Sequence, residues 1–186
     1  MVYNEYGEPI TLPLNPQPGT FEYNYKCDIL ADHLNDVSLY VKKLYKTTST
    51  NGIAFNYFLY GEESPGIHEG VDVVKGSGEN LYNIVEGKVV AKTNSTNLSV
   101  LGVYDSVHDV TVFYMHMNIA AAVPAVGSEE NFKKASLIGT EDNRGYNIPT
   151  HTHIQIQSGL KTTAASGQDT TLTFLKPYAY LWFYCR

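Results

Sequence analysis

Two histidines stand one residue apart in the segment Thr150–Gln157, which reads THTHIQIQ. In a β-strand, side chains at positions i and i+2 leave the same face. His151 and His153 would therefore point to one side, and Gln155 and Gln157 would continue that face. The opposite face, turned toward a core, would carry Thr152, Ile154 and Ile156. Two parallel imidazoles suit a metal ligand beside an acid–base partner, although an exposed, solvated pair has the same spacing.

Two further segments carry residues of the same chemical types. His68 and Asp72 lie four positions apart in GIHEGVD, where Gly70 permits a tight backbone path between them. A catalytic zinc site uses three protein ligands with nitrogen or oxygen donors and leaves the fourth position for water. His68, Asp72 and one histidine of the 151/153 pair complete that number.

A third segment, VTVFYMH, ends at His116. The alternation predicts a strand in which Val112, Tyr114 and His116 share a face. Taken alone, this segment is also compatible with a buried histidine whose hydrogen-bonding groups are paired with a neighbouring residue. Together with the spare histidine of the pair, it would supply the proton transfer and oxyanion stabilisation that metal-assisted hydrolysis requires.

The elements that must position these residues are mostly short strands. From Thr50 onward, β-type runs alternate with Gly, Asn and Ser: IAFNYFLY, VDVV, LYNIVEGKVVAKT, LSVLGVYDS, DVTVFYMHM, SLIGT and HTHIQIQ. Such runs indicate an antiparallel sheet that folds over on itself. Residues 28–46 have helical spacing of apolar side chains. We therefore expect an N-terminal extension over residues 1–50, with a helix near 28–46, and a mainly β domain over residues 51–186.

Composition limits the classes of function. The net charge of −6 and the pI near 5.4 disfavour a nucleic-acid partner. The chain has no apolar run of about 18 residues, so no membrane span is expected. Its N-terminus lacks the features of a secretory signal. Cys27 and Cys185 are the two cysteines, and their spacing leaves open whether they pair.

Taken in order, His68-x-Gly70-x-Asp72, Tyr114-x-His116 and His151-x-His153 resemble the signature of the lysostaphin/LytM-type zinc endopeptidases. The resemblance covers roughly residues 55–182. It includes a hairpin formed by Leu81-Tyr82 and Glu86-Gly87-Lys88-Val89-Val90, and a closing segment, Pro177-Tyr178-Ala179-Tyr180-Leu181. It implies an antiparallel, folded-over β-sheet and the hydrolysis of peptide bonds in bacterial peptidoglycan.

The same resemblance implies the site. His68, Asp72 and His153 would bind one zinc ion per chain, with water as the fourth ligand. His116 and His151 would jointly assist the water, and which of the two takes its proton stays open. Tyr60 would help to hold the oxyanion, with Tyr57 in reserve; a packed aromatic residue is the alternative reading for each tyrosine.

Some positions depart from the family pattern. Pro149 is displaced by one residue from the Gly-Pro that usually precedes the histidine pair, Ile154-Gln155 replaces Phe-Glu, and Met117 replaces Leu. No predicted ligand is lost. These differences concern the substrate and the shape of the groove rather than the metal.

Three functions are compared on these grounds. The first is a zinc-dependent peptidoglycan endopeptidase; the second is a non-catalytic wall-binding or hydrolase-activating module on the same fold. The third, a carrier domain suggested by the Glu86–Val89 hairpin, leaves the histidines unexplained. The enzyme would act outside the cell, in the periplasm or from a phage. Because an acidic protein gains no electrostatic adsorption to an anionic wall, we expect a larger chain or particle with a separate targeting module.

Overall fold

The computed structural model describes residues 2–3, 9–10, 41–57, 70–145 and 148–164. Strands β1 (Val2–Tyr3) and β2 (Pro9–Ile10) form an antiparallel pair. The remaining strands are β3 (Ala54–Tyr57), β4 (Gly70–Val74), β5 (Asn80–Tyr82), β6 (Lys88–Asn94), β7 (Ser99–Asp105), β8 (Val110–Ile119), β9 (Leu137–Arg144) and β10 (Thr152–Ser158).

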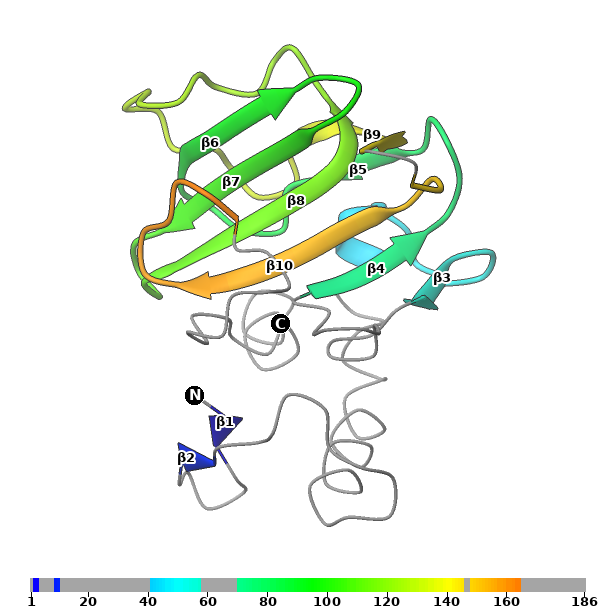
Figure 1. The fold of residues 1–186 in the computed structure, drawn as a ribbon, viewed down its shortest axis with the longest axis horizontal. Helices are drawn as coiled ribbons and strands as arrows, with labels where there is room; N and C mark the ends of the chain where they lie inside the picture. Colours follow the sequence, from blue (N-terminus) through cyan, green and yellow to red (C-terminus); the bar gives the residue numbers. More distant parts are fainter. Residues whose placement is uncertain (1, 4–8, 11–40, 58–69, 146–147, 165–186) are drawn as a thin grey trace.

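These eight strands form one sheet in the order β3-β4-β10-β8-β7-β6, while β9 pairs with both β8 and β5 (Figure 1). Every strand pairing is antiparallel. The predicted mainly β, antiparallel fold is confirmed. The order also places β10, the last described strand, between β4 and β8, so the three strands with the candidate site residues are neighbours.

The register of β10 separates an apolar face from a polar one. Ile154 lies opposite Val71 of β4 and Tyr114 of β8, and all three are fully buried. Residues directly opposite each other in a sheet project to the same face. The prediction that the isoleucines of THTHIQIQ face the core is therefore confirmed, and His153 leaves the other face.

The segment before β3 also contributes to the core. Residues 41–44 are helical, and Val41 and Leu44 are fully buried in the same cluster as the apolar face of the sheet. Tyr45 follows and donates a hydrogen bond of 2.5 Å to the Glu141 carboxylate of β9. The rest of the predicted helix, residues 28–40, lies outside the described residues.

The predicted hairpin between Leu81-Tyr82 and Glu86–Val90 is wrong. β5 pairs with β9, and β6 pairs with β7. The chain after β5 forms hydrogen bonds with residues 132–136 instead. The side-chain amide of Asn83 donates to the carbonyl oxygens of Phe132 and Lys133, and Gly87 forms a β-bridge with Phe132. These contacts direct the chain away from β5 before β6 begins.

Candidate active site

Four of the predicted site residues lie in the described part of the chain: Asp72, His116, His151 and His153. They come together where the start of β10 lies between β4 and β8. The predicted ligand His68 and the predicted oxyanion donor Tyr60 lie outside the described residues. Tyr57, the reserve, pairs through its backbone with Asp72.

Asp72 and His153 face each other across β4 and β10. Their side chains leave the same face of the sheet, and the Nδ1 atom of His153 lies 2.9 Å from Oδ1 of Asp72. Both residues are only 5% exposed. Burying a carboxylate is costly unless a partner compensates its charge, so this pair requires a proton or a cation between or beside its two atoms.

The other ring nitrogen of His153 has a hydrogen-bonding partner of its own. Its Nε2 atom lies 3.3 Å from Oε1 of Gln155, whose amide nitrogen donates to Gln157. The amide oxygen of Gln155 faces the imidazole and can accept a hydrogen bond from a protonated Nε2. Protons on both ring nitrogens would require an imidazolium. A cation beside Nδ1 would let a neutral imidazole keep its proton on Nε2, the arrangement usual for metal-bound histidines.

Gly70 makes room for this imidazole. A Cβ atom at Gly70 would lie 2.2 Å from the Ile154 carbonyl oxygen and 2.6 Å from Nε2 of His153. Both distances are far below van der Waals contact. The glycine between the two predicted ligands is therefore required because β10 approaches closely. The backbone path from His68 to Gly70 lies outside the described residues, so the predicted tight path stays a prediction.

His116 reaches the polar face through an irregularity in β8. Its φ angle is +68°, and the register with β9 shifts between His116 and Asn118. Positive φ is uncommon for residues other than glycine and costs energy. Tyr114 faces the core, whereas the His116 ring centroid lies 4.6 Å from that of His151 and 6.1 Å from that of His153. The prediction that Val112, Tyr114 and His116 share a face is wrong because of this bulge.

His116 and His151 expose equivalent ring nitrogens. Nδ1 of His116 donates to the Arg144 carbonyl oxygen at 3.2 Å, and Nδ1 of His151 donates to that of Pro149 at 2.8 Å. A carbonyl oxygen only accepts, so in each neutral ring the proton sits on Nδ1 and Nε2 keeps its lone pair. Each residue can thus act as a base through Nε2.

Electrostatics keeps His116 neutral. Burial, reinforced by the neighbouring His151 and His153, lowers the pKa of His116 to about 4. His151 is 6% exposed, and its Nε2 atom lies 3.6 Å from Oδ2 of Asp72. A neutral His116 beside an oriented His151 provides two proton acceptors within a few ångströms of the Asp72–His153 pair.

The donor set of the described residues fits part of a zinc site. Two ligand atoms of a tetrahedral zinc ion lie roughly 3.3 Å apart, close to the 2.9 Å between the Asp72 and His153 atoms. Among the described residues, no group of three or more His, Cys, Asp and Glu side chains forms a complete metal site. The predicted third ligand, His68, belongs to the segment outside them.

The sequence did not identify the roles of two contacts around the site. The alternating sequence placed Gln155 and Gln157 on the face of His153. It did not predict that these glutamines form a hydrogen-bonded chain that holds the His153 ring. Glu141 was not singled out at all. It is 1% exposed and accepts hydrogen bonds from Tyr45 and from the backbone N–H groups of Lys75 and Gly76, just after the strand that bears Asp72.

Comparisons with known proteins find likeness in structure rather than in sequence. No protein-family model matches the chain, and no curated protein sequence matches it. The catalytic domain of the antimicrobial peptidase lysostaphin from Staphylococcus simulans superposes with a TM-score of 0.51 at 23% identity, covering 69% of this chain and 90% of that one.

Two other solved structures are similar. LytU gives a TM-score of 0.50 at 21% identity, covering 66% of this chain and 79% of that chain. A chain of the SpoIIIAH–SpoIIQ complex gives 0.51 at 14% identity, covering 71% and 94%. Identities this low show a shared fold and leave activity open. The protein described here therefore has the LytM/lysostaphin-type peptidase fold.

Proposed function

We propose that the protein is a zinc-dependent endopeptidase that hydrolyses peptide bonds in bacterial peptidoglycan. The observation that carries the proposal is the buried pairing of His153 Nδ1 with Asp72, supported from behind by Gln155. The lysostaphin-type fold supports the class of reaction. His68, Asp72 and His153 would hold the zinc ion. When bound, zinc supplies Lewis-acid chemistry, because it acidifies water and polarises a peptide carbonyl.

The remaining histidines handle the proton. The Nε2 atom of His116 or His151 accepts the proton that the attacking water loses, and it returns that proton to the amine released when the C–N bond breaks. The backbone carbonyls of Arg144 and Pro149 hold each ring with Nε2 toward the site. Tyr60 would donate a hydrogen bond to the oxyanion.

The test is cleavage of purified peptidoglycan together with measurement of bound zinc. We expect the wild type to bind one zinc ion and to release peptide fragments. His116→Ala and His151→Ala should retain zinc but lose at least about 100-fold in rate, whereas Asp72→Ala should lose zinc. His108→Ala is the matched control, because His108 is exposed in the β7–β8 turn and pairs with Asp105.

The same measurements separate the enzyme from a non-catalytic wall-binding or hydrolase-activating module. A protein that binds walls and zinc but releases no fragments would favour the module. Absence of zinc binding, with the fold intact, would refute the proposed metal site.

We also propose that the protein acts at the bacterial wall, outside the cell, in the periplasm or as part of a phage. Among the described residues, no helix is long and apolar enough to cross a membrane. The net charge of −6 opposes adsorption to an anionic wall. Delivery by a separate targeting module, in a larger chain or particle, therefore remains part of the proposal.

A further inference from the structure

The strained backbone of His116, with its φ of +68°, needs support from its surroundings, and the end of β9 provides it. Arg144 lies opposite His116 in the β8–β9 register, and its carbonyl oxygen accepts the hydrogen bond from Nδ1 of the ring at 3.2 Å. The next residue also comes close, since a Cβ atom at Gly145 would lie 3.1 Å from the same ring nitrogen. The direction of the His116 ring therefore depends on where the backbone of residues 144–145 is held.

The end of β9 also holds His151. The backbone N–H of His151 donates to the Asp142 carbonyl oxygen at 3.2 Å, and the two residues form an isolated β-bridge. The centroids of the His116 and His151 rings are 4.6 Å apart. Because residues 142–144 contact both histidines, a shift of this short stretch would change the position of each ring relative to the other.

The side chain of Arg144 fixes this stretch at two points. Its Nε atom donates to Oδ2 of Asp142 at 3.0 Å, and its Nη1 atom donates to Oδ1 of Asn94 at 2.9 Å. A guanidinium is planar and presents its N–H groups in a rigid fork, so it can hold two acceptors in one geometry. The Arg144 and Asp142 side chains are only 25% and 30% exposed, so water screens their ion pair less than it would on an open surface.

Asn94 connects Arg144 to β8 just beyond the bulge. The register of β7 with β8 runs as far as Met115, whereas β8 continues to Ile119. There the Asn94 side chain bonds to both backbone groups of Ile119: Oδ1 accepts from the N–H at 3.1 Å, and Nδ2 donates to the carbonyl oxygen at 3.2 Å. Asn94 thus pairs with this part of β8 as a neighbouring strand would, and its single amide group joins β6, β8 and β9.

We propose that Asn94, Asp142 and Arg144, which we call the clamp, position His116 and His151 for proton transfer. The three are positioning residues, because they act on the backbone around the two rings and not on reacting atoms. An intact clamp keeps the Nδ1 proton of His116 on the Arg144 carbonyl and so leaves Nε2 as the base. The catalytic consequence rests on the proposed function, whereas the orientation of the ring can be measured without zinc or substrate.

Histidine ¹⁵N NMR of the zinc-free full chain at pH 8 tests the clamp directly. The two nitrogens of a neutral imidazole resonate differently according to which of them carries the proton. We expect wild-type His116 to carry its proton on Nδ1. Asn94→Ala and Arg144→Met should each give a mixture of the two tautomers, because the Arg144 carbonyl is no longer held in place. The wild-type tautomer in both folded variants would overturn the proposal.

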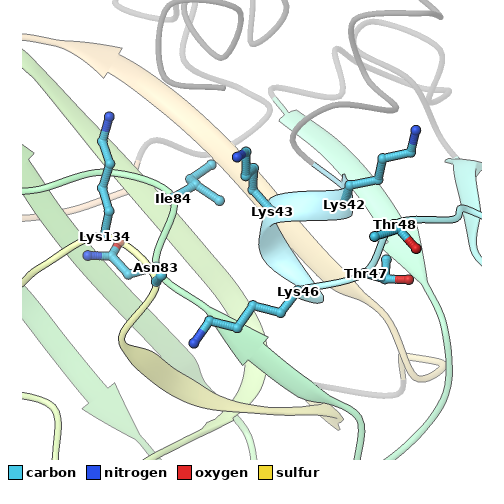
Figure 2. A pocket seen from close by; sticks show the side chains of 9 residues that line it. Lys42, Lys43, Lys46, Thr47, Thr48, Asn83, Ile84 and Lys134 are labelled. Carbon is cyan, nitrogen blue, oxygen red and sulfur yellow. The ribbon is translucent and has the colours of Figure 1, made fainter. Parts of the chain in front are cut away.

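Lys46→Met is the matched control for charge. It makes the same change in net charge as Arg144→Met and removes a cation that lies 4.1 Å from the centre of the Tyr82 ring. Lys46 lines a pocket beside the helical residues 41–44, and the described residues that line this pocket include none of the clamp (Figure 2). The His116 tautomer should match the wild type. A change as large as that in Arg144→Met would indicate a general effect of charge and refute the clamp.

The double variant Asn94→Ala/Arg144→Met tests whether the two residues act together. Because each loses the same contact between β6 and β9, the double variant should change the tautomer ratio by less than the sum of the two single variants. Fully additive changes would show that Asn94 and Arg144 act separately, which contradicts a clamp.

Kinetics on soluble, cross-linked peptidoglycan fragments connect the clamp to the proposed reaction. Arg144→Met should lower kcat about tenfold or more, because misplaced proton acceptors lose rate, and should leave KM within about twofold and bound zinc unchanged. A rise in KM at constant kcat would show that Arg144 binds substrate and would overturn the positioning role. If the wild type releases no fragments, the proposed endopeptidase fails while the tautomer comparison still decides the clamp.

Discussion

At the scale of single residues, the proposed metal position depends on the support behind His153. Gln155 fixes the Nε2 atom, and so leaves Nδ1 directed at Asp72. A ligand held in this way binds metal more tightly because its ring need not be oriented on binding. The amide oxygen of Gln155 therefore belongs to the proposed site, because it orients the imidazole of His153.

Replacing Gln155 with leucine removes this acceptor at similar volume. We expect zinc affinity to fall about 10- to 100-fold, because the imidazole loses its orienting partner. Competition with a chromophoric chelator measures the affinity, and Ile156→Leu, on the core face, is the control. Unchanged affinity in Gln155→Leu would show that this contact does not orient the ligand.

Gly70→Ala should disturb both stability and metal binding. The added methyl group would collide with the Ile154 carbonyl and His153, and such overpacking costs about 1–3 kcal/mol. Denaturant unfolding and zinc titration report the two effects. Gly127→Ala is the matched control: its φ is +82° with nothing within 4 Å, so it should cost about 1–2 kcal/mol of backbone strain and leave zinc affinity unchanged. Equal zinc affinity in both variants would argue against the steric explanation.

Residue types alone indicated much of this cluster. The i, i+2 spacing correctly placed the glutamines on the face of His153, and Ile154 and Ile156 in the core. The choice of His153 over His151 as ligand did not follow from spacing, since both share a side of the chain. It came from the family resemblance, and the roles of His68 and Tyr60 remain predictions.

At the scale of elements, β8 shows the limit of alternation. A regular strand would have turned His116 into the core beside Tyr114. The bulge that redirects His116 leaves no distinct mark in YMHM, because any residue type can occupy such a position when its surroundings compensate the strain. The strands themselves could be recognised from the sequence. The pairing partners of β5 and β6 could not, because they depend on contacts with residues 132–136 that the local sequence pattern does not encode.

The Tyr45–Glu141 hydrogen bond joins the segment before β3 to β9. Burial raises the pKa of Glu141, and the hydrogen bond from Tyr45 opposes that rise. Burial, and next the Glu141 charge, raise the pKa of Tyr45, so its hydroxyl stays a donor. An acid whose pKa is raised by folding binds its proton more tightly in the native state. Its contribution to stability is therefore present below the unfolded pKa and is lost as pH rises through the folded value.

Tyr45→Phe should thus destabilise the protein in a pH-dependent manner. The loss of the donor leaves the buried carboxylate less satisfied, at a cost of about 1–3 kcal/mol, and the pKa of Glu141 rises further. We expect a larger loss at pH 7 than at pH 5 by urea unfolding. Combining it with Glu141→Gln should remove most of this pH dependence. A loss that is equal at both pH values would show that the carboxylate is not the affected group.

At the scale of the whole molecule, bound zinc would connect strands that are remote in sequence. A ligand that binds only the folded state stabilises it by about 2.7 kcal/mol at one hundred times its Kd. For a chain of this size, that corresponds to a rise in Tm of about 5–10 °C. Calorimetry with zinc and with a chelator measures the change. Asp72→Ala should show no rise, and an equal rise in that variant would place the ion elsewhere.

The position of β10 has a consequence for biosynthesis. His153 and Asp72 are separated by 81 positions, and β10 must enter between two strands made earlier. Strand pairing over such sequence distances is slow, because the chain loses the entropy of loop closure before the long-range contacts form and stabilise it. A nascent chain that ends before Thr152 therefore lacks both the bridging strand and the second histidine. The proposed ligand set cannot assemble until the ribosome has passed β10, so the proposed hydrolase would be inert while it is only partly synthesised.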